Sequence, residues 1–330
     1  GWTCEPFGIP GLEWKEYTEP IPEDVRRYFA EIDGERALWG GIPLNTNLCY
    51  SNAEVRRRIV EAIADYAAGN PEVTHLHFWL ADGTNNNCEC ADCRKKRPSD
   101  FYAMMLNDVD EELTRRRLAT KIVFLIYVDL LWPPEEVALR DSDRFVLMFA
   151  PITRTYARPF LGGADGGGAA AAADRAAGED RAAGEDRAAG LGGAAGPLEL
   201  PPFVRNELEF PTSPEGNVAF LRAWQEIFTG DGFDFDYHLM WDHYLDPGAM
   251  SIAKTLHADL RDLSTIGLNG NVSCQVQRVA FPTGLPMYVL GETLWNPGRS
   301  FDEIATEYFQ AAFGRYGAEI RTYQIGRAHV

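Results

Sequence analysis

The chain has 330 residues, of which 45% are hydrophobic and 12% aromatic, so it can bury a sizeable core. Its formal net charge of -18 argues against nucleic-acid binding, which requires clustered Lys and Arg side chains. No apolar run approaches the roughly 20 residues of a membrane span, so none is expected.

The two ends are interpreted separately from the rest. Residues 1–42 are taken as the end of a preceding barrel region or a linker, and Asp33-Gly34 between apolar flanks predicts a short hairpin there. Residues 325–330 (IGRAHV) resemble the translation of a common sequencing-library adapter, and we expect them to be an artefact. We therefore expect an amino-terminally truncated domain.

From residue 43 onward, strand-like and helix-like patterns alternate. Six predicted strands begin near Pro43, Val73, Lys121, Phe145, Phe233 and Gly270. Capping boxes formed by Ser51 with Glu54 and by Ser300 with Glu303 mark the starts of two predicted helices. Such alternation predicts a parallel sheet, either an open doubly wound sheet or an eight-stranded barrel.

The barrel is the preferred prediction. No glycine-rich phosphate turn follows an early strand, so no nucleotide cofactor is expected. Charged and aromatic residues instead follow several different strands, which is how a barrel assembles its site. The sequence therefore predicts a (β/α)8 TIM-type barrel over residues 43–324, in which the six strands are strands three to eight and C-terminal helices follow.

Residues 162–200 interrupt this pattern with a Gly- and Ala-rich, low-complexity segment. The hexamer DRAAGE, or its truncation, begins at Asp174, Asp180 and Asp186. The segment has no aromatic residue, so it cannot bury enough apolar surface to offset its ordering entropy. We predict a disordered insertion within the barrel.

The most distinctive stretch is LHFWLADGTNNNCECADC, residues 76–93, in which a predicted buried strand runs into a polar, cysteine-rich loop. Together with LNDVDEEL, KIVFLIYVDLLWPP, FDYHLMWDH, LWNP and FDEIATEYFQAAFG, it resembles the bacterial family called domain of unknown function 4838. The resemblance covers most of residues 43–314 outside the insertion. It implies a glycosidase-type barrel, similar to those of α-glucuronidases and hexosaminidases, but it supplies no catalytic residues.

Two carboxyl groups at predicted strand ends are the catalytic candidates. Glycoside hydrolysis needs two carboxyls that flank the scissile bond. Asp82, after the predicted fourth strand, is expected to be the general acid, and Asp242, after the predicted seventh strand, the base or nucleophile. The alternative for Asp82 is a turn pair with Gly83 that only caps the loop.

Further polar and aromatic residues near predicted strand ends are expected to bind substrate. They are Trp79, Asn85, Asp129, Arg154, His238, Trp241, His243, Gln275 and Arg278. Arg278 would suit a carboxylate-bearing sugar through its bidentate guanidinium. For His238, a buried ion pair with Asp236 explains the pattern equally well, and core packing accounts for most tryptophans.

Three cysteines in the loop predict a metal site. Cys88, Cys90 and Cys93 form CxCxxC, and Cys49, at the end of the neighbouring predicted strand, is the expected fourth ligand. Close thiolates hold Zn²⁺ tetrahedrally, so a structural zinc ion is predicted. The alternatives are free thiols and a catalytic metal centre.

These features favour a carbohydrate-active enzyme, a glycoside hydrolase that acts on a poly- or oligosaccharide. The alternative is a barrel that binds carbohydrate without cleaving it and carries a structural zinc-cysteine loop. Loss of turnover with retained sugar binding in the variants Asp82→Asn and Asp242→Asn would distinguish the first from the second.

Overall fold

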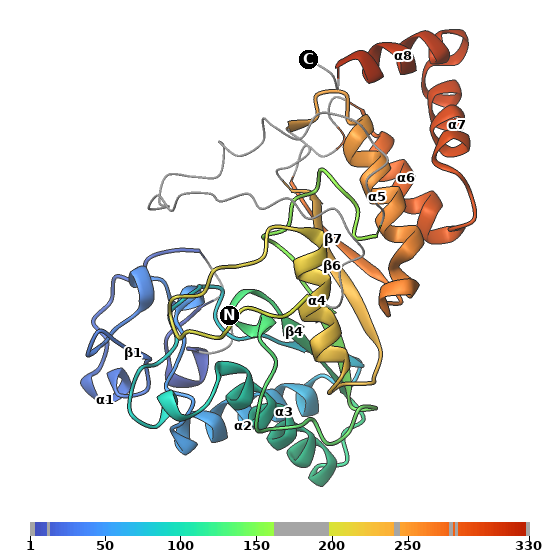
Figure 1. The fold of residues 1–330 in the computed structure, drawn as a ribbon. Coiled ribbons are helices and arrows are strands. Elements are labelled where there is room, and N and C mark those ends of the chain that lie inside the picture. The colour runs from blue at the N-terminus through green and yellow to red at the C-terminus, as the bar shows by residue number, and fades with distance from the viewer. Residues whose placement is uncertain are drawn as a thin grey trace. The chain divides into compact units, whose positions relative to one another are not determined.

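The computed structural model describes residues 4–11, 14–161, 198–240, 245–276, 280 and 283–327. The chain divides into two compact units (Figure 1). The first unit comprises Gly1–Thr153, Pro201–Phe210 and Phe220–Asp234, and the second comprises Arg154–Leu200, Pro211–Ala219 and Phe235–Val330.

The first unit begins with the helix α1 (Glu23–Arg26) and an antiparallel hairpin, β1 (Glu31–Ile32) and β2 (Glu35–Arg36). The turn residues Asp33 and Gly34 have φ angles of 52° and 81°, the left-handed pair that a two-residue hairpin turn requires. The predicted hairpin is therefore confirmed.

The prediction of a strand that begins at Pro43 is wrong. Pro43–Asn45 forms a single 3-10 turn instead. The Thr46 hydroxyl donates to the Ile42 carbonyl and accepts from the Trp39 amide, both at 2.8 Å, so the segment folds back on itself. The helix α2 (Ala53–Gly69) follows, and Asn52 caps it through the Glu54 amide rather than Ser51.

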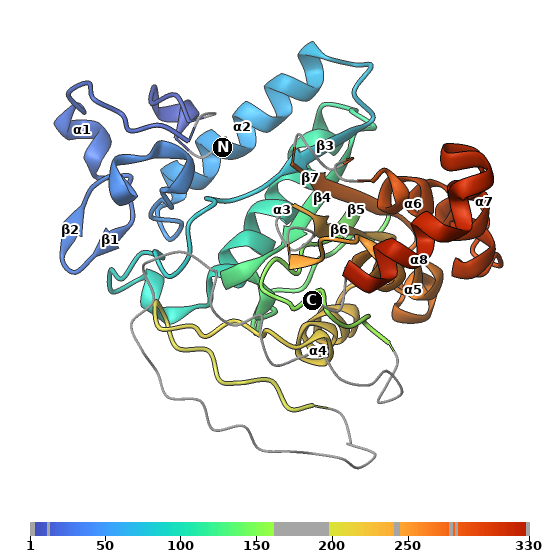
Figure 2. The ribbon, with the colours of Figure 1, turned by 90° about the horizontal axis from the view of Figure 1, so that it is seen from above.

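Parallel strands form the sheet of the first unit. They are β3 (His75–Phe78), β4 (Lys121–Ile126) and β5 (Phe145–Phe149), and β6 (Gly232–Leu239) pairs with β5 through its first residues. The helix α3 (Pro98–Arg115) connects β3 to β4 and packs against α2 (Figure 2). The predicted strand-helix-strand order is thus present here.

A cluster of buried aromatic rings forms the core of the first unit. Phe124 on β4 contacts Tyr102, Phe145, Trp224 and Phe228 with ring centroids 5.0–6.5 Å apart. The Tyr102 hydroxyl also donates to the Phe78 carbonyl and accepts from the Leu125 amide. Helix α3 is therefore bonded to the ends of β3 and β4, where the loops of the candidate site begin.

The second unit contains the end of β6, β7 (Asn271–Gln275) and a series of helices. In chain order these helices are α5 (Met250–Asp262), α6 (Leu285–Trp295), α7 (Phe301–Phe313) and α8 (Gly317–Arg327), and each packs on the next. The predicted capping box of Ser300 and Glu303 starts α7. The helix α4 (Pro214–Gln225) and strand β6 each pass from one unit to the other.

The expectation of a (β/α)8 TIM-type barrel is wrong. In the described residues the main sheet has five strands, in the order β3-β4-β5-β6-β7, whereas a closed barrel of this type needs eight. Alternating patterns indicate a parallel sheet but not the number of its strands, and one predicted strand is the turn at Pro43. The predicted disordered insertion, 162–200, lies outside the described residues as far as residue 197.

Candidate functional site

The loop that follows β3 carries most of the candidate site, and we call residues 83–96 the cysteine loop. On one side, the Glu89 amide donates to the Glu31 carbonyl of β1 at 2.7 Å. On the other side, the Asn87 amide donates to Asn206 Oδ1, and Asn206 Nδ2 donates to the Asn87 carbonyl, both at 2.8 Å. Segments distant in sequence therefore fix the loop backbone, so its side chains are held in place.

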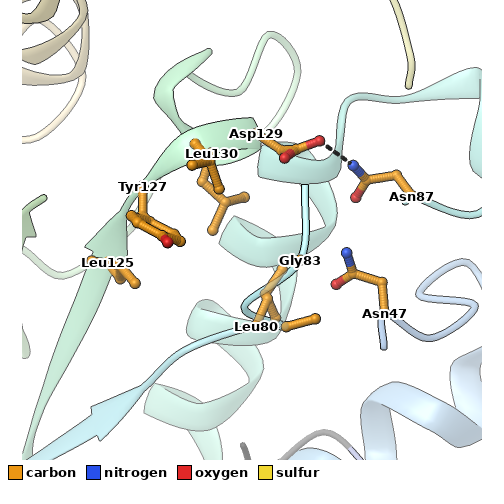
Figure 3. Close-up of a pocket in the computed structure, with 10 residues that line it drawn as sticks. Asn47, Leu80, Gly83, Asn87, Leu125, Tyr127, Asp129 and Leu130 are labelled. Carbon is orange, nitrogen blue, oxygen red and sulfur yellow. Dashed lines mark hydrogen bonds between the residues drawn. The ribbon is translucent and has the colours of Figure 1, made fainter. Parts of the chain in front are cut away.

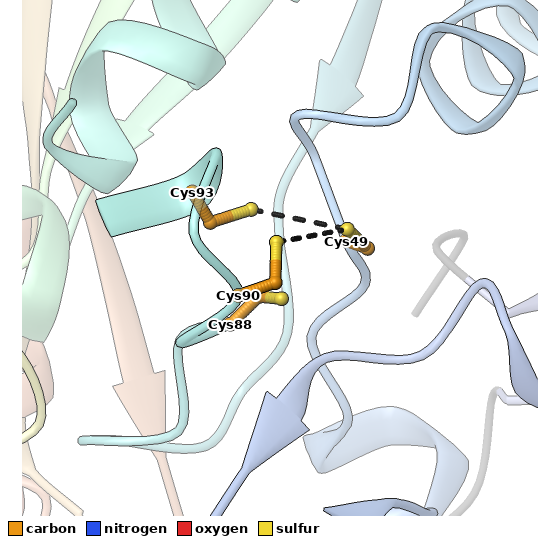
Figure 4. A group of neighbouring side chains, drawn as sticks. All are labelled: Cys49, Cys88, Cys90 and Cys93. Atoms are coloured by element: carbon orange, nitrogen blue, oxygen red, sulfur yellow. Dashed lines mark hydrogen bonds between the residues drawn. The ribbon is translucent and has the colours of Figure 1, made fainter. Parts of the chain in front are cut away.

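Four cysteines converge at this loop (Figure 4). The sulfur atoms of Cys49, Cys88, Cys90 and Cys93 all lie within 4.8 Å of one another. Cys49 Sγ is 3.7 Å from Cys90 Sγ and 3.9 Å from Cys93 Sγ. Four sulfurs bound tetrahedrally to Zn²⁺ at about 2.3 Å lie about 3.8 Å apart. All four are free thiols, so this cluster can hold a metal ion.

Hydrogen-bond donors point at these sulfurs. The Glu31 amide donates to Cys88 Sγ at 3.3 Å, the Cys90 amide also donates to Cys88, and the Cys93 amide donates to the Cys90 sulfur. Amide donors favour the thiolate over the thiol, because they stabilise the charged form. The backbone is thus arranged for thiolates, which are the species that bind metals.

The four thiols cannot all ionise without a cation. Hydrogen bonds from Cys88 and Cys93 lower the pKa of Cys49 far below its usual range. The same contacts with Cys49 raise the pKa of Cys88 to about 11 and raise the pKa of Cys93 still further. Against its burial, the pKa of Cys90 is lowered as well, by the hydrogen bond from the Cys93 amide, so Cys49 and Cys90 favour the thiolate. Cys88 and Cys93 resist ionisation unless a bound cation offsets the repulsion between thiolates.

A small pocket with a mixed polar and apolar lining lies at the carboxyl ends of β3 and β4 (Figure 3). Its lining residues are Asn47, Leu80, Ala81, Gly83, Asn87, Leu125, Tyr127, Val128, Asp129 and Leu130. The Asp129 carboxylate accepts hydrogen bonds from the Asn85 amide at 2.9 Å and from Asn87 Nδ2 at 2.8 Å. Burial raises the pKa of Asp129 to about 6, against these hydrogen bonds, which lower it. Asp129 thus connects β4 to the cysteine loop.

Asp82, the predicted general acid, lies beside this pocket, between the lining residues Ala81 and Gly83. Its amide donates to the Leu44 carbonyl at 3.0 Å, which holds the end of β3 in place. Burial raises the pKa of the Asp82 carboxyl, and a hydrogen bond with Tyr127 partly opposes this. Asp82 and Asp129 therefore follow neighbouring parallel strands and both favour the protonated form more than an exposed carboxyl does.

Of the other predicted site residues, three in this group are described by the structure and four are not. Asn85 is engaged by the backbone of Leu208, since it accepts from that residue's amide at 2.8 Å and donates to its carbonyl at 3.2 Å. Trp79 is half-buried with its ring 5.5 Å from His77, and Gln275 is exposed at the end of β7. The remaining predictions, Trp241, Asp242, His243 and Arg278, lie outside the described residues.

In the second unit, Arg154 and His238 meet in a buried charge network with Asp236 and Asp259. Arg154 Nη2 donates to Asp259 Oδ2 at 2.8 Å, His238 Nε2 is 2.8 Å from the same oxygen, and His238 Nδ1 contacts Asp236. Burial opposes the charged form of His238, but the two carboxylates outweigh it and raise its pKa. The network therefore pairs an arginine and a histidine with two carboxylates.

Sequence reasoning missed several residues around the cysteines. Arg36 Nη1 lies 3.9 Å from Cys88 Sγ. Arg205 donates to the carbonyls of Cys88 at 3.2 Å and Cys93 at 2.7 Å. Neither arginine carries a local signal, because one lies in the hairpin and the other follows residues 162–200. The asparagine run that contains Asn87 was visible, but its partners were not.

These features define an α/β protein with a four-cysteine cluster and a small pocket at the carboxyl ends of neighbouring parallel strands. Residues 11–168 match the model of the family described as Domain of unknown function (DUF4838), and this part of the chain is assigned to that family. The family resemblance is thus confirmed over the hairpin, the cysteine loop and β3 to β5. No curated protein and no solved structure shows a significant match. Among the helices described, none is long and apolar enough to cross a membrane.

Proposed function

We propose that Cys49, Cys88, Cys90 and Cys93 bind one structural Zn²⁺ ion. The sulfur spacing, the amide donors and the mutual repulsion of the thiolates all support this assignment. Four protein ligands leave no open coordination position for water or substrate, which is the arrangement of a structural rather than a catalytic zinc site. The ion would hold the cysteine loop against the segment that carries Cys49.

Zinc content of the purified protein tests this proposal. We expect about one zinc ion per chain by mass spectrometry of the metal, and intense thiolate-to-metal absorption after replacement by Co²⁺. Cys90→Ser should lower the zinc content, whereas Cys274→Ser, in the second unit, is the control and should not change it. A folded wild-type chain that takes up no zinc would contradict the assignment.

We also propose that the protein is a carbohydrate-active enzyme, a glycoside hydrolase in which Asp82 is the general acid. The supporting observation is the position of Asp82 at the end of β3, beside a small pocket, with a pKa that burial raises. A general acid must remain protonated near the working pH, and a raised pKa meets this need. The second carboxyl, Asp242, stays a prediction.

A screen of the protein against a glycan library, followed by kinetics on any substrate found, tests the enzyme proposal. Asp82→Asn is expected to lower kcat by about 10²- to 10⁴-fold, the usual contribution of general acid catalysis. Asp92→Asn is the matched control, because Asp92 is an exposed carboxylate of the same loop that pairs with Lys95. Equal activity of wild type and Asp82→Asn would exclude Asp82 as the acid.

Carbohydrate binding without cleavage is the alternative, and the contacts of Asp129 favour it. Donors from Asn85 and Asn87 occupy the Asp129 carboxylate, so this group holds the cysteine loop rather than a reacting sugar. Sugar binding by wild type and by Asp82→Asn, with no hydrolysis by either, would support the alternative over the enzyme.

A further inference from the structure

A zinc ion with four thiolate ligands has a net charge of about -2, which is costly to bury unless cations lie nearby. Cys49, Cys88 and Cys93 are buried, with exposed fractions of 6%, 3% and 2%. The proposed zinc site therefore requires compensating charge from the protein. Among the described residues, Arg36 and Arg205 approach the cysteines from outside the loop.

The two arginines contact the loop in different ways. Arg205 reaches it through main-chain carbonyls, those of Cys88, Cys93 and Lys96, and so holds the backbone. Arg36 instead reaches the sulfurs: its Nη1 is 3.9 Å from Cys88 Sγ, and it also hydrogen-bonds with Cys49. Arg36 is therefore the cation that faces the proposed ligand atoms.

The Arg36 guanidinium is held in this position from its other side. Nη1 donates to the Phe29 carbonyl at 2.5 Å, and Nη2 pairs with the Glu31 carboxylate at 3.1 Å. Its side chain is 25% exposed, so water screens its charge only in part. The Glu31 amide, in turn, donates to Cys88 Sγ. The hairpin thus presents one guanidinium and one amide to Cys88.

We propose that Arg36 is an outer-sphere partner of the bound metal, a positioning residue whose positive charge offsets the thiolates of Cys49 and Cys88 and sets the metal affinity of the site. This inference rests on the proposed zinc site and deepens it. The competing explanation is that Arg36 only braces the hairpin through its ion pair with Glu31. The two explanations make opposite predictions for Glu31, because the Glu31 carboxylate draws the guanidinium charge away from the sulfurs.

The test measures zinc affinity of the full chain by competition with a chromophoric chelator. Arg36→Gln is expected to weaken zinc binding about 10- to 100-fold, as loss of outer-sphere partners commonly does. Arg36→Lys should recover part of that loss, since it keeps the charge. Glu31→Gln leaves the amide donor to Cys88 in place and is expected to bind zinc as tightly as wild type or more tightly. Arg27→Gln is the matched control, because Arg27 contacts Tyr28 rather than the cysteines.

A second readout separates charge from a damaged ligand set. At saturating Co²⁺, Arg36→Gln should give the same thiolate-to-metal absorption as wild type, because the four ligands are unchanged. Equal zinc affinity of Arg36→Gln and wild type would overturn the inference. So would a loss in Glu31→Gln as large as that in Arg36→Gln, since it would assign Arg36 to bracing alone. Failure of wild type itself to bind zinc is a distinct result that removes the zinc site and this inference together.

Discussion

The cysteine cluster of the first unit and the buried charge network of the second both bring ionisable side chains together, but their charges are balanced in opposite ways. Each places four ionisable groups within contact distance and away from water. The network combines Arg154 and His238 with two carboxylates, so its charges cancel internally. The cluster gathers four groups of one kind, whose charges repel. A network that contains both signs of charge needs no added ion to be stable. A cluster of four thiolates has only negative charges and requires a bound cation.

Removing one charge from the network should produce the largest effect. Arg154→Met leaves two carboxylates with only His238 as a cation, and loss of one partner of a buried pair typically costs about 3–5 kcal/mol. We expect a fall of that size in the free energy of unfolding, measured by urea denaturation. Arg158→Met is the control, because its pair with Glu215 is half-exposed and should contribute about 1 kcal/mol or less. Equal effects of the two changes would contradict a self-neutralised network.

Chelation should distinguish the two regions more directly. Removal of zinc is expected to cost the first unit about 4 kcal/mol when free zinc had been about 1,000 times its Kd. Hydrogen exchange should therefore accelerate in peptides of residues 83–96 after treatment with a chelator. Peptides of residues 250–262, which carry Asp259, should exchange as before. Unchanged protection of the cysteine loop would show that no metal stabilises it.

The pH dependence of stability should have opposite signs in the two regions, with the smallest effects. The pKa of His238 is raised in the folded state, so its contribution is fully present below about pH 6.5 and is lost as pH rises through the folded-state pKa. Each pKa unit of difference is worth about 1.4 kcal/mol. Metal binding by the cysteines instead weakens as pH falls, because protons compete for the thiolates.

Unfolding measured at pH 6 and pH 9 tests the histidine contribution. With zinc held in excess, His238→Gln should lose less stability than wild type between the two values, because it no longer gives up a proton. A wild-type stability that rises over this interval, with His238→Gln unchanged in slope, would show that another group dominates.

The cysteine cluster was easier to predict than the fold. The spacing of Cys88, Cys90 and Cys93 identified the loop, and the structure brings Cys49 to it as expected. The prediction that Cys49 ends a strand was nevertheless wrong, because Cys49 follows a 3-10 turn. Proline and asparagine at positions 43 and 45 favoured the turn, while the apolar residues around them resembled a strand.

What the sequence could not supply was the set of contacts between distant segments. Asn206 and Arg205 bind the cysteine loop from more than 100 positions away, and no local pattern marks them. The prediction of eight strands in a closed barrel was wrong for a similar reason. Alternating strands and helices are local features, whereas closure of a barrel depends on which edges pair. A buried ion pair of His238 with Asp236 was one of the alternatives, but their partners Arg154 and Asp259 were not identified.

The Tyr102 hydroxyl replaces one backbone hydrogen bond between β3 and β4. The Lys121 amide donates to the Thr74 carbonyl, and the same parallel register, continued along the strands, would join the Leu125 amide to the Phe78 carbonyl. Tyr102 binds both groups instead. The two strands can therefore separate here while their polar groups stay satisfied, and the pocket of Leu80, Leu125 and Tyr127 begins at this point. A single hydroxyl from helix α3 thus satisfies the two backbone groups that the strands leave unjoined where the pocket begins.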